Sequence, residues 1–255
     1  MKKEETRFQE SNIMEGMVSF RAVIRGIESG ISDRKIEKVI FDTTRKKNLK
    51  GHLSYIRAMS AKYNFPIEEV TKEEIDSLAI GSSHGGVLIF TSDRTLPTLS
   101  EVPKKDGFYV LLNGIEDPYN FGYALRSLYA AGCDGILLGE RNWLSAAGVV
   151  ARASAGASEA FPVFAGDPLS ALTVLKEMGY HIVAAGIRDS VSMYEANLKK
   201  PLVLVVGGEK RGVSREVMTL CDQTVRIDYG REFRGSLSAA SAATVLGFEV
   251  LHQNK

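Results

Sequence analysis

The sequence contains few of the residues that support disulfide or metal chemistry. It has two cysteines, Cys133 and Cys221, and four histidines among 255 residues. The cysteines lie far apart, and no Cys or His residues show the spacing of a metal site. The sequence therefore predicts neither a disulfide framework nor a bound metal. Reduced thiols of this kind are typical of a cytoplasmic protein.

Long apolar runs and a strong charge of one sign are also absent. No run of about 18 apolar residues occurs, and the first ten residues are polar, so we expect neither a membrane span nor a signal peptide. The formal net charge is only +1. Residues 1–60 nevertheless carry 13 Lys and Arg against 8 Asp and Glu. This excess predicts a basic patch that attracts phosphates; a solvated polar surface is the alternative.

The first part of the chain is typical of a small α/β domain over residues 12–92. Phe20, Val23 and Ile24 recur at helical spacing and predict a helix over 15–29. Thr71 opens a Thr-Lys-Glu-Glu pattern of the capping-box type. Further elements are expected as strands at 38–41 and 85–90 and as a helix at 51–63. Residues 93–106, with two prolines, are expected to be a linker.

Residues 107–255 show regular alternation of apolar strands and helices. Such alternation predicts an α/β fold with a parallel sheet covered on both faces. Strands are expected at 108–112, 135–138, 160–163, 181–185, 202–206 and 224–227, and helices at 121–131, 144–152, 169–178, 213–220 and 236–252.

The first candidate motif joins a predicted strand to a helix. It runs from Asn113 to Arg126 as NGIEDPYNFGYALR. Open α/β sheets usually bind ligands at such strand ends. Asp117 and Pro118 suit a helix N-terminus, and Arg126 lies one turn beyond Gly122. A well-capped helix with a surface arginine is the alternative interpretation.

Two further motifs lie nearer the C-terminus. Residues 205–213, VVGGEKRGV, place a glycine-rich turn after an apolar strand. Glycines let the backbone approach a ligand closely, but the spacing is neither that of a P-loop nor G-x-G-x-x-G. A polar loop from Ile227 then leads to a helix of small residues, with Ser236 as the expected N-cap. A plain turn and a closely packed helix are the structural alternatives.

Taken together, the three motifs resemble the SpoU, or TrmH, family of RNA ribose methyltransferases in the SPOUT superfamily. The family pattern N-x-x-D-P-x-N-x-G-x-x-x-R is matched across Asn113 to Arg126 with one additional residue between Asn113 and Asp117, and G-x-E-x-x-G is complete from Gly207 to Gly212. The third pattern, I-P-M followed by S-L-N, is partial. Its proline, methionine and asparagine are replaced by Asp228, Tyr229 and Ser238.

The resemblance implies a trefoil-knotted methyltransferase domain at 107–255 and an RNA-binding domain of the ribosomal-protein L30e type at 12–92. A knot would not follow from general rules, because true knots are rare. The resemblance also implies a homodimer that uses S-adenosylmethionine to methylate a ribose 2′-hydroxyl of RNA, with ribosomal RNA favoured over tRNA.

Residue by residue, the resemblance assigns roles to three groups of side chains. An RNA-binding or assembly protein without turnover, and a base methyltransferase, remain alternatives to this assignment. The catalytic residues are expected to be Arg126, Asn120, Glu209 and Ser236, the cofactor-binding residues Gly207, Ile227 and Leu237, and the RNA-binding residues Arg45, Lys46, Lys47 and Lys50.

Overall fold

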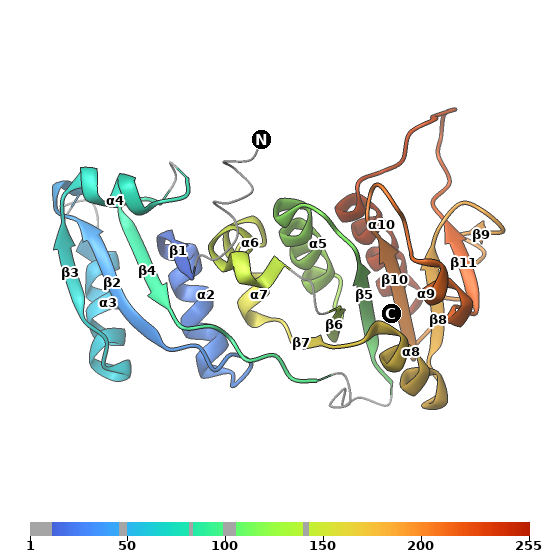
Figure 1. Ribbon diagram of the computed structural model, residues 1–255, viewed down its shortest axis with the longest axis horizontal. Helices are drawn as coiled ribbons and strands as arrows, with labels where there is room; N and C mark the ends of the chain where they lie inside the picture. Colours follow the sequence, from blue (N-terminus) through green and yellow to red (C-terminus); the bar gives the residue numbers. More distant parts are fainter. Residues whose placement is uncertain (1–11, 46–49, 82–83, 99–105, 140–142) are drawn as a thin grey trace. The chain divides into compact units, whose positions relative to one another are not determined.

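The chain forms two compact units in a computed structural model that describes residues 12–45, 50–81, 84–98, 106–139 and 143–255 (Figure 1). The first unit contains the residues up to Thr95 together with Trp143–Ala160. The second contains Leu96–Asn142 and Phe161–Lys255. The predicted second domain, 107–255, thus included a segment, 143–160, that the structure groups with the first unit.

A four-stranded mixed sheet forms the centre of the first unit. Val39 and Phe41 contribute to its main core, while Ile40 between them packs on the opposite face. This alternation arises because successive strand residues point to opposite faces. In spatial order, the strands are β1 (Ile13–Glu15), β4 (Val87–Thr91), β2 (Ile36–Asp42) and β3 (Ile67–Val70), of which only the β2–β3 pair is parallel.

The helices of the first unit follow the predicted patterns closely. Phe20, Val23 and Ile24 are buried on the first of them, as their spacing predicted. The capping box is also confirmed: Thr71 accepts a hydrogen bond from the Glu74 backbone N–H, and the Glu74 carboxylate accepts one from the Thr71 N–H. The helices are α2 (Gly16–Glu28), η2 (Thr43–Arg45), α3 (Lys50–Tyr63), α4 (Lys72–Leu78), η4 (Trp143–Ala146), α6 (Ala147–Ala153) and α7 (Ala157–Ala160).

Ion pairs join residues 143–160 to the rest of the first unit. Arg34 Nε and Glu159 Oε2 lie 2.9 Å apart, and both side chains are only 2% exposed. Arg152 Nη1 lies 2.9 Å from Glu15, whose carboxylate also accepts two backbone N–H groups. Buried charges are tolerated only when paired and hydrogen-bonded in this way. Ala147 and Ala151 of this segment also belong to the apolar core of the unit, so packing and ion pairs together attach 143–160 to it.

The second unit is built on a seven-stranded, wholly parallel sheet. Its central strands are apolar and buried on both faces, as the sequence predicted. In spatial order, the strands are β7 (Val163–Ala165), β6 (Gly135–Leu138), β5 (Phe108–Asn113), β10 (Leu202–Gly207), β8 (His181–Ala185), β11 (Gln223–Arg226) and β9 (Val191–Ser192).

Helices cover the two faces of this sheet in pairs. α8 (Pro168–Glu177) and α9 (Arg215–Leu220) pack together over the face that includes Tyr109 and Val203. α5 (Pro118–Ala130) packs along α10 (Ala239–Gln253), which also contacts β10. Figure 1 shows the two pairs on either side of the strands. The predicted α/β fold with a parallel sheet is confirmed, and the knotted chain path stays a prediction.

Two features depart from the expectations. The predicted strand at 160–163 is wrong, because Ala157–Ala160 is helical as α7 and the strand begins at Val163. The short strands β1, β3 and β9 were not predicted.

Both cysteines are free thiols, and burial raises the pKa of Cys133. Among the described residues, none of the helices is long and apolar enough to cross a membrane.

The Arg34–Glu159 pair generates a test of this arrangement. Replacing Glu159 by Ala leaves the Arg34 charge buried without its partner, so we expect the first unit to lose about 3–5 kcal/mol of stability. Denaturant unfolding followed by the fluorescence of Trp143, the single tryptophan, measures this loss. The apolar double variant Arg34→Met/Glu159→Leu should recover most of it.

The matched control is the exposed Lys62–Glu28 pair, whose side chains are about half exposed. Glu28→Ala should change stability by less than about 1 kcal/mol, because water screens exposed pairs. Equal effects of Glu28→Ala and Glu159→Ala would contradict the assigned role of the buried pair.

Candidate functional site

The carboxyl ends of the central strands meet at one edge of the second sheet. Because the strands are parallel, the segments that follow β5, β8, β10 and β11 all leave from this edge. Asn113 at the end of β5 is paired in register with Gly207 at the end of β10. The first and second motifs, about ninety residues apart in sequence, are therefore adjacent in space.

The turn after β10 is packed against the turn after β5, backbone against backbone. The Gly208 N–H donates to the Asn113 carbonyl oxygen at 3.0 Å, and the Asn113 side-chain oxygen accepts from the Ser214 N–H at 3.1 Å. A Cβ atom at Gly208 would lie 1.9 Å from the Gly114 carbonyl oxygen. Only glycine fits at this position, since no real Cβ contact is that short.

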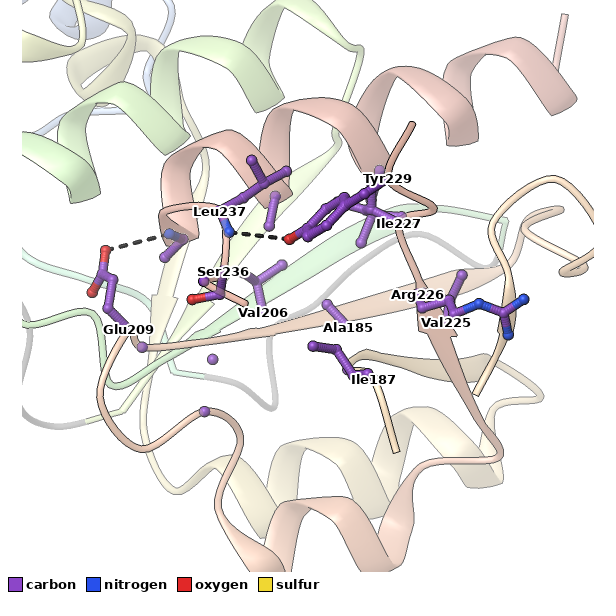
Figure 2. A pocket seen from close by; sticks show the side chains of 18 of the residues that line it. Ala185, Ile187, Val206, Glu209, Val225, Arg226, Ile227, Tyr229, Ser236 and Leu237 are labelled. Atoms are coloured by element: carbon purple, nitrogen blue, oxygen red, sulfur yellow. Dashed lines mark hydrogen bonds between the residues drawn. The ribbon is translucent and has the colours of Figure 1, made fainter. Parts of the chain in front are cut away.

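Glu209 connects this turn to two helices. Its Oε1 accepts from the Asn120 side-chain amide of α5 at 2.8 Å. It also accepts from the Ala239 N–H at 3.3 Å (Figure 2). Ala239 is the first residue of α10, where a carboxylate is favoured by the exposed N–H groups and the helix dipole. Glu209 and Asn120, both predicted catalytic residues, are thus joined directly.

The third motif forms the opposite wall of the site. Ser238, not the predicted Ser236, is the N-cap of α10, since its hydroxyl accepts from the Ser241 N–H. Ser236 lies two residues earlier and is exposed, so the prediction of its capping role is wrong. The Leu237 N–H donates to the Tyr229 hydroxyl at 3.2 Å (Figure 2).

Asp228, which replaces the family proline, anchors the segment after β11 through hydrogen bonds. Its carboxylate accepts from the Ser192 hydroxyl and from Arg226 Nε, the latter at 2.9 Å. Arg226 also donates to the Ser190 carbonyl oxygen at 2.7 Å. The Ser192 hydroxyl, followed by the Arg226 charge, lowers the pKa of Asp228. The carboxylate therefore stays ionised at neutral pH and ties this segment to β9.

A cavity of about 520 Å³ opens among these segments, a volume typical of small-molecule sites. Glycine backbone and apolar side chains dominate its lining, and the polar side chains include Glu209, Arg226 and Ser236. This combination suits a ligand that is held largely by main-chain groups. The lining residues fall within 185–187, 206–212, 225–229 and 233–246.

The structure brings together most of the predicted site residues of the second unit. Gly207, Ile227 and Leu237, predicted to bind the cofactor, all line the cavity, as do Glu209 and Ser236. Asn120 reaches it through its hydrogen bond to Glu209.

Arg126, in contrast, does not line the cavity. It is exposed on α5, on the same stripe as the exposed Tyr119 and Tyr123, at helical positions i, i+4 and i+7.

The predicted RNA-binding residues belong to the first unit. Arg45 is half exposed and lies 3.5 Å from the buried Asp42 carboxylate. Lys50 is exposed at the start of α3. Lys46 and Lys47 lie outside the described residues. Arg45 also lines a cavity of about 460 Å³ with Lys72, Asp76, Ala79, Ile80, Gly81 and His84.

Sequence reasoning missed the wall formed by residues 185–187. These residues follow β8, which carries no motif and lies beside β10 only through the strand order. The aromatic side chains of Tyr229 and Phe233 were also missed as lining residues. Tyr229 had been noted only as a departure from the family pattern.

Comparison with known proteins establishes the class. The SpoU rRNA Methylase family profile matches residues 107–248. A Staphylococcus saprophyticus protein, whose name assigns it provisionally to the TrmH family of tRNA/rRNA methyltransferases, is 30% identical over 89% of this chain and 92% of its own. The chain therefore belongs to the SpoU rRNA methylase family, whose members are RNA methyltransferases that use S-adenosylmethionine.

Two further similar proteins have names that state a more specific activity. The 23S rRNA (guanosine-2′-O-)-methyltransferase RlmB of Shewanella oneidensis is 29% identical over 74% of this chain and 79% of its own length. An AdoMet-bound rRNA methyltransferase from Sinorhizobium meliloti has the same fold, with a TM-score of 0.78 at 23% identity. That alignment covers 93% of this chain and 85% of the other.

The glycine turn yields a direct test of the cavity. In Gly208→Ala the new Cβ must displace the Gly114 carbonyl, so the turn moves and the affinity for S-adenosylmethionine should fall at least about tenfold, the effect of about 1.4 kcal/mol. Isothermal titration calorimetry measures the affinity.

Gly230→Ala, in the loop after β11, is the matched control. A Cβ there meets nothing within 4 Å. It should bind S-adenosylmethionine like the wild type. Unchanged affinity in Gly208→Ala, with circular dichroism showing a folded protein, would contradict the placement of the ligand beside this turn.

Proposed function

We propose that this protein transfers the methyl group of S-adenosylmethionine to a ribose 2′-hydroxyl of structured RNA, either ribosomal RNA or tRNA. The observation that carries the proposal is the convergence of three motifs, distant in sequence, on one glycine-lined cavity. The name of the similar RlmB protein, a guanosine-2′-O-methyltransferase of 23S rRNA, supports ribose as the acceptor and ribosomal RNA as the substrate.

The residues present fit an adenosyl ligand. Side chains are excluded at Gly207 and Gly208, where a Cβ would lie within 2.2 Å of neighbouring backbone atoms, so main-chain groups face the cavity there. Ile227, Leu237 and Leu246 provide apolar walls. Such a site can hold a planar heterocycle between apolar groups while backbone N–H and C=O groups hydrogen-bond its edges.

The reaction requires the acceptor oxygen, the methyl carbon and the sulfur to be aligned. When bound, S-adenosylmethionine supplies a methyl group already activated on a sulfonium. The chain's own residues must position the ribose hydroxyl and manage its proton. Glu209 holds the α5 and α10 ends in place through Asn120 and the Ala239 N–H. Arg126 positions the 2′-oxygen or a neighbouring phosphate, because a guanidinium donates hydrogen bonds and stays charged.

Arg126 can position the 2′-oxygen or phosphate only if it faces a cavity that holds S-adenosylmethionine. Its exposed stripe on α5 also carries Tyr119 and Tyr123, and Phe248 is exposed on α10, which packs along α5. Exposed aromatic clusters of this kind are typical of protein interfaces. We therefore propose a homodimer in which α5 and α10 form the interface and Arg126 of one protomer faces the cavity of its partner.

Arg126→Ala should abolish methyl transfer and leave S-adenosylmethionine affinity unchanged, because the residue lies outside the cavity of its own protomer. Transfer of a radiolabelled methyl group to RNA, with calorimetry for binding, measures both effects. Mixing Arg126→Ala with Gly208→Ala protomers should restore activity, since the mixed dimer contains one intact cavity facing one intact arginine. Unchanged methylation by Arg126→Ala would refute its role, and failed complementation would place its action within one protomer.

The first unit is proposed to bind RNA as the L30e-type domain, through phosphates and shape. Arg45→Ala/Lys50→Ala should weaken RNA binding and reduce the slope of log K against log salt by about one per lost phosphate contact. Filter binding at several salt concentrations measures this slope.

Lys38→Ala/Lys62→Ala, which removes the same charge from exposed ion pairs elsewhere on the unit, is the control. It should change the slope less. An equal change in both double variants would mean that net charge, not this patch, determines binding.

An RNA-binding protein with little turnover is the second candidate, favoured by Ser238. A family asparagine offers an amide at that position, whereas the Ser238 hydroxyl is engaged in capping α10. Nuclease digestion and mass spectrometry of RNA treated with the protein decide the matter. A 2′-O-methyl nucleoside supports the proposed function, a methylated base indicates base methylation, and unmodified RNA indicates the binder. A cytoplasmic location is part of the same proposal.

A further inference from the structure

An exposed aromatic pair lies at the opening of the cavity. Phe233 and Tyr229 both line it, yet these residues are 60% and 39% exposed. Their ring centroids lie 5.8 Å apart with the planes tilted by 55°. Large apolar surface left in water is unfavourable, and where it borders a binding site it marks a contact surface for a partner.

The pair is held in position by its surroundings. The Tyr229 hydroxyl accepts from the Leu237 N–H, which fixes that ring at the wall of the cavity (Figure 2). The Phe233 ring rests on the backbone of Gly235, where an added Cβ would lie 2.5 Å from its Cζ. A ring already held in place loses little conformational freedom when a second ring stacks on it.

Charge around the pair favours a polyanion. Arg231 and Arg234 flank Phe233 and are exposed, and Arg234 also lines the cavity. Glu232 lies between them, which leaves the segment 231–234 with a net charge of +1. Aromatic side chains combined with arginines form the surfaces on which single-stranded nucleic acid binds, because bases stack on the rings and phosphates pair with the guanidinium groups.

We propose that Phe233 is a stacking platform for an unpaired nucleobase of the substrate RNA, with Arg231 and Arg234 contacting the adjoining phosphates. The proposal rests on the RNA methyltransferase function proposed above. An unpaired nucleotide of a loop or bulge can be splayed out so that its ribose enters a cavity, and an aromatic ring then replaces the stacking that its base loses. Phe233 is therefore a positioning residue for the acceptor nucleotide.

The first test measures initial rates of methyl transfer to ribosomal RNA purified from cells that lack this protein. Phe233→Ala should raise the KM for RNA by about tenfold, since that is the scale of losing one base–aromatic stack. The affinity for S-adenosylmethionine and the oligomeric state should stay as in the wild type. Phe233→Trp, which keeps a stacking surface, should retain a KM near that of the wild type.

The control is Tyr194→Ala, which removes an aromatic residue that is 70% exposed in the same unit but does not line the cavity. It should leave the KM unchanged. If the wild type methylates RNA but Phe233→Ala shows an unchanged KM, only the stacking role is overturned. Failure of the wild type to methylate any RNA would instead overturn the proposed function.

The second test observes stacking directly, without turnover. With Trp143 replaced by Phe, Phe233→Trp places the only tryptophan at the cavity opening. The same ribosomal RNA should quench its fluorescence, whereas a Tyr194→Trp reporter in the same background should change little. Equal quenching at both positions would overturn the proposal. Two further outcomes would overturn the proposal. A lower affinity of the Phe233→Ala variant for S-adenosylmethionine would assign the ring to cofactor binding. Dissociation of the variant into monomers would assign the ring to the dimer interface.

Discussion

The site depends on one constraint: two turns must approach each other through their backbones. The turn after β10 meets the turn after β5 at Gly208, where a side chain would overlap the Gly114 carbonyl oxygen. Hydrogen bonds from the Gly208 and Ser214 N–H groups to Asn113 hold this contact. With side chains excluded, main-chain groups line the cavity, and the loops from β8 and β11 complete its walls.

Polar contacts then connect the walls to each other. Glu209 binds the Asn120 amide and the first N–H of α10, so one carboxylate connects both helices to the glycine turn. On the far side, Asp228 replaces the rigidity of a proline by hydrogen bonds from Ser192 and Arg226. The segment after β11 is thus anchored by hydrogen bonds where the family pattern has a proline. Tyr229, which replaces the family methionine, accepts a hydrogen bond from the Leu237 N–H.

Much of the fold was predictable because local patterns carried it. Helices with a clear apolar stripe, such as α2, and strands buried on both faces, such as β10, were placed within a few residues. Short strands such as β9 were missed, because two or three residues carry no detectable periodicity. The contacts of segment 143–160 with the first unit were not predicted, since the Arg34–Glu159 and Glu15–Arg152 pairs join residues more than a hundred positions apart.

The sequence by itself determined the class of fold and the positions of the three motifs, because spacing along the chain encodes strand ends and turns. The resemblance of these motifs to the SpoU family pointed to Gly207, Glu209, Ile227 and Leu237, which all line the cavity. Only the tertiary structure decided that β8 contributes a wall, that Ser238 rather than Ser236 caps α10, and that Arg126 is exposed on α5 and does not line the cavity. Those outcomes depend on strand order and on the direction of side chains, which arise from packing between segments distant in sequence.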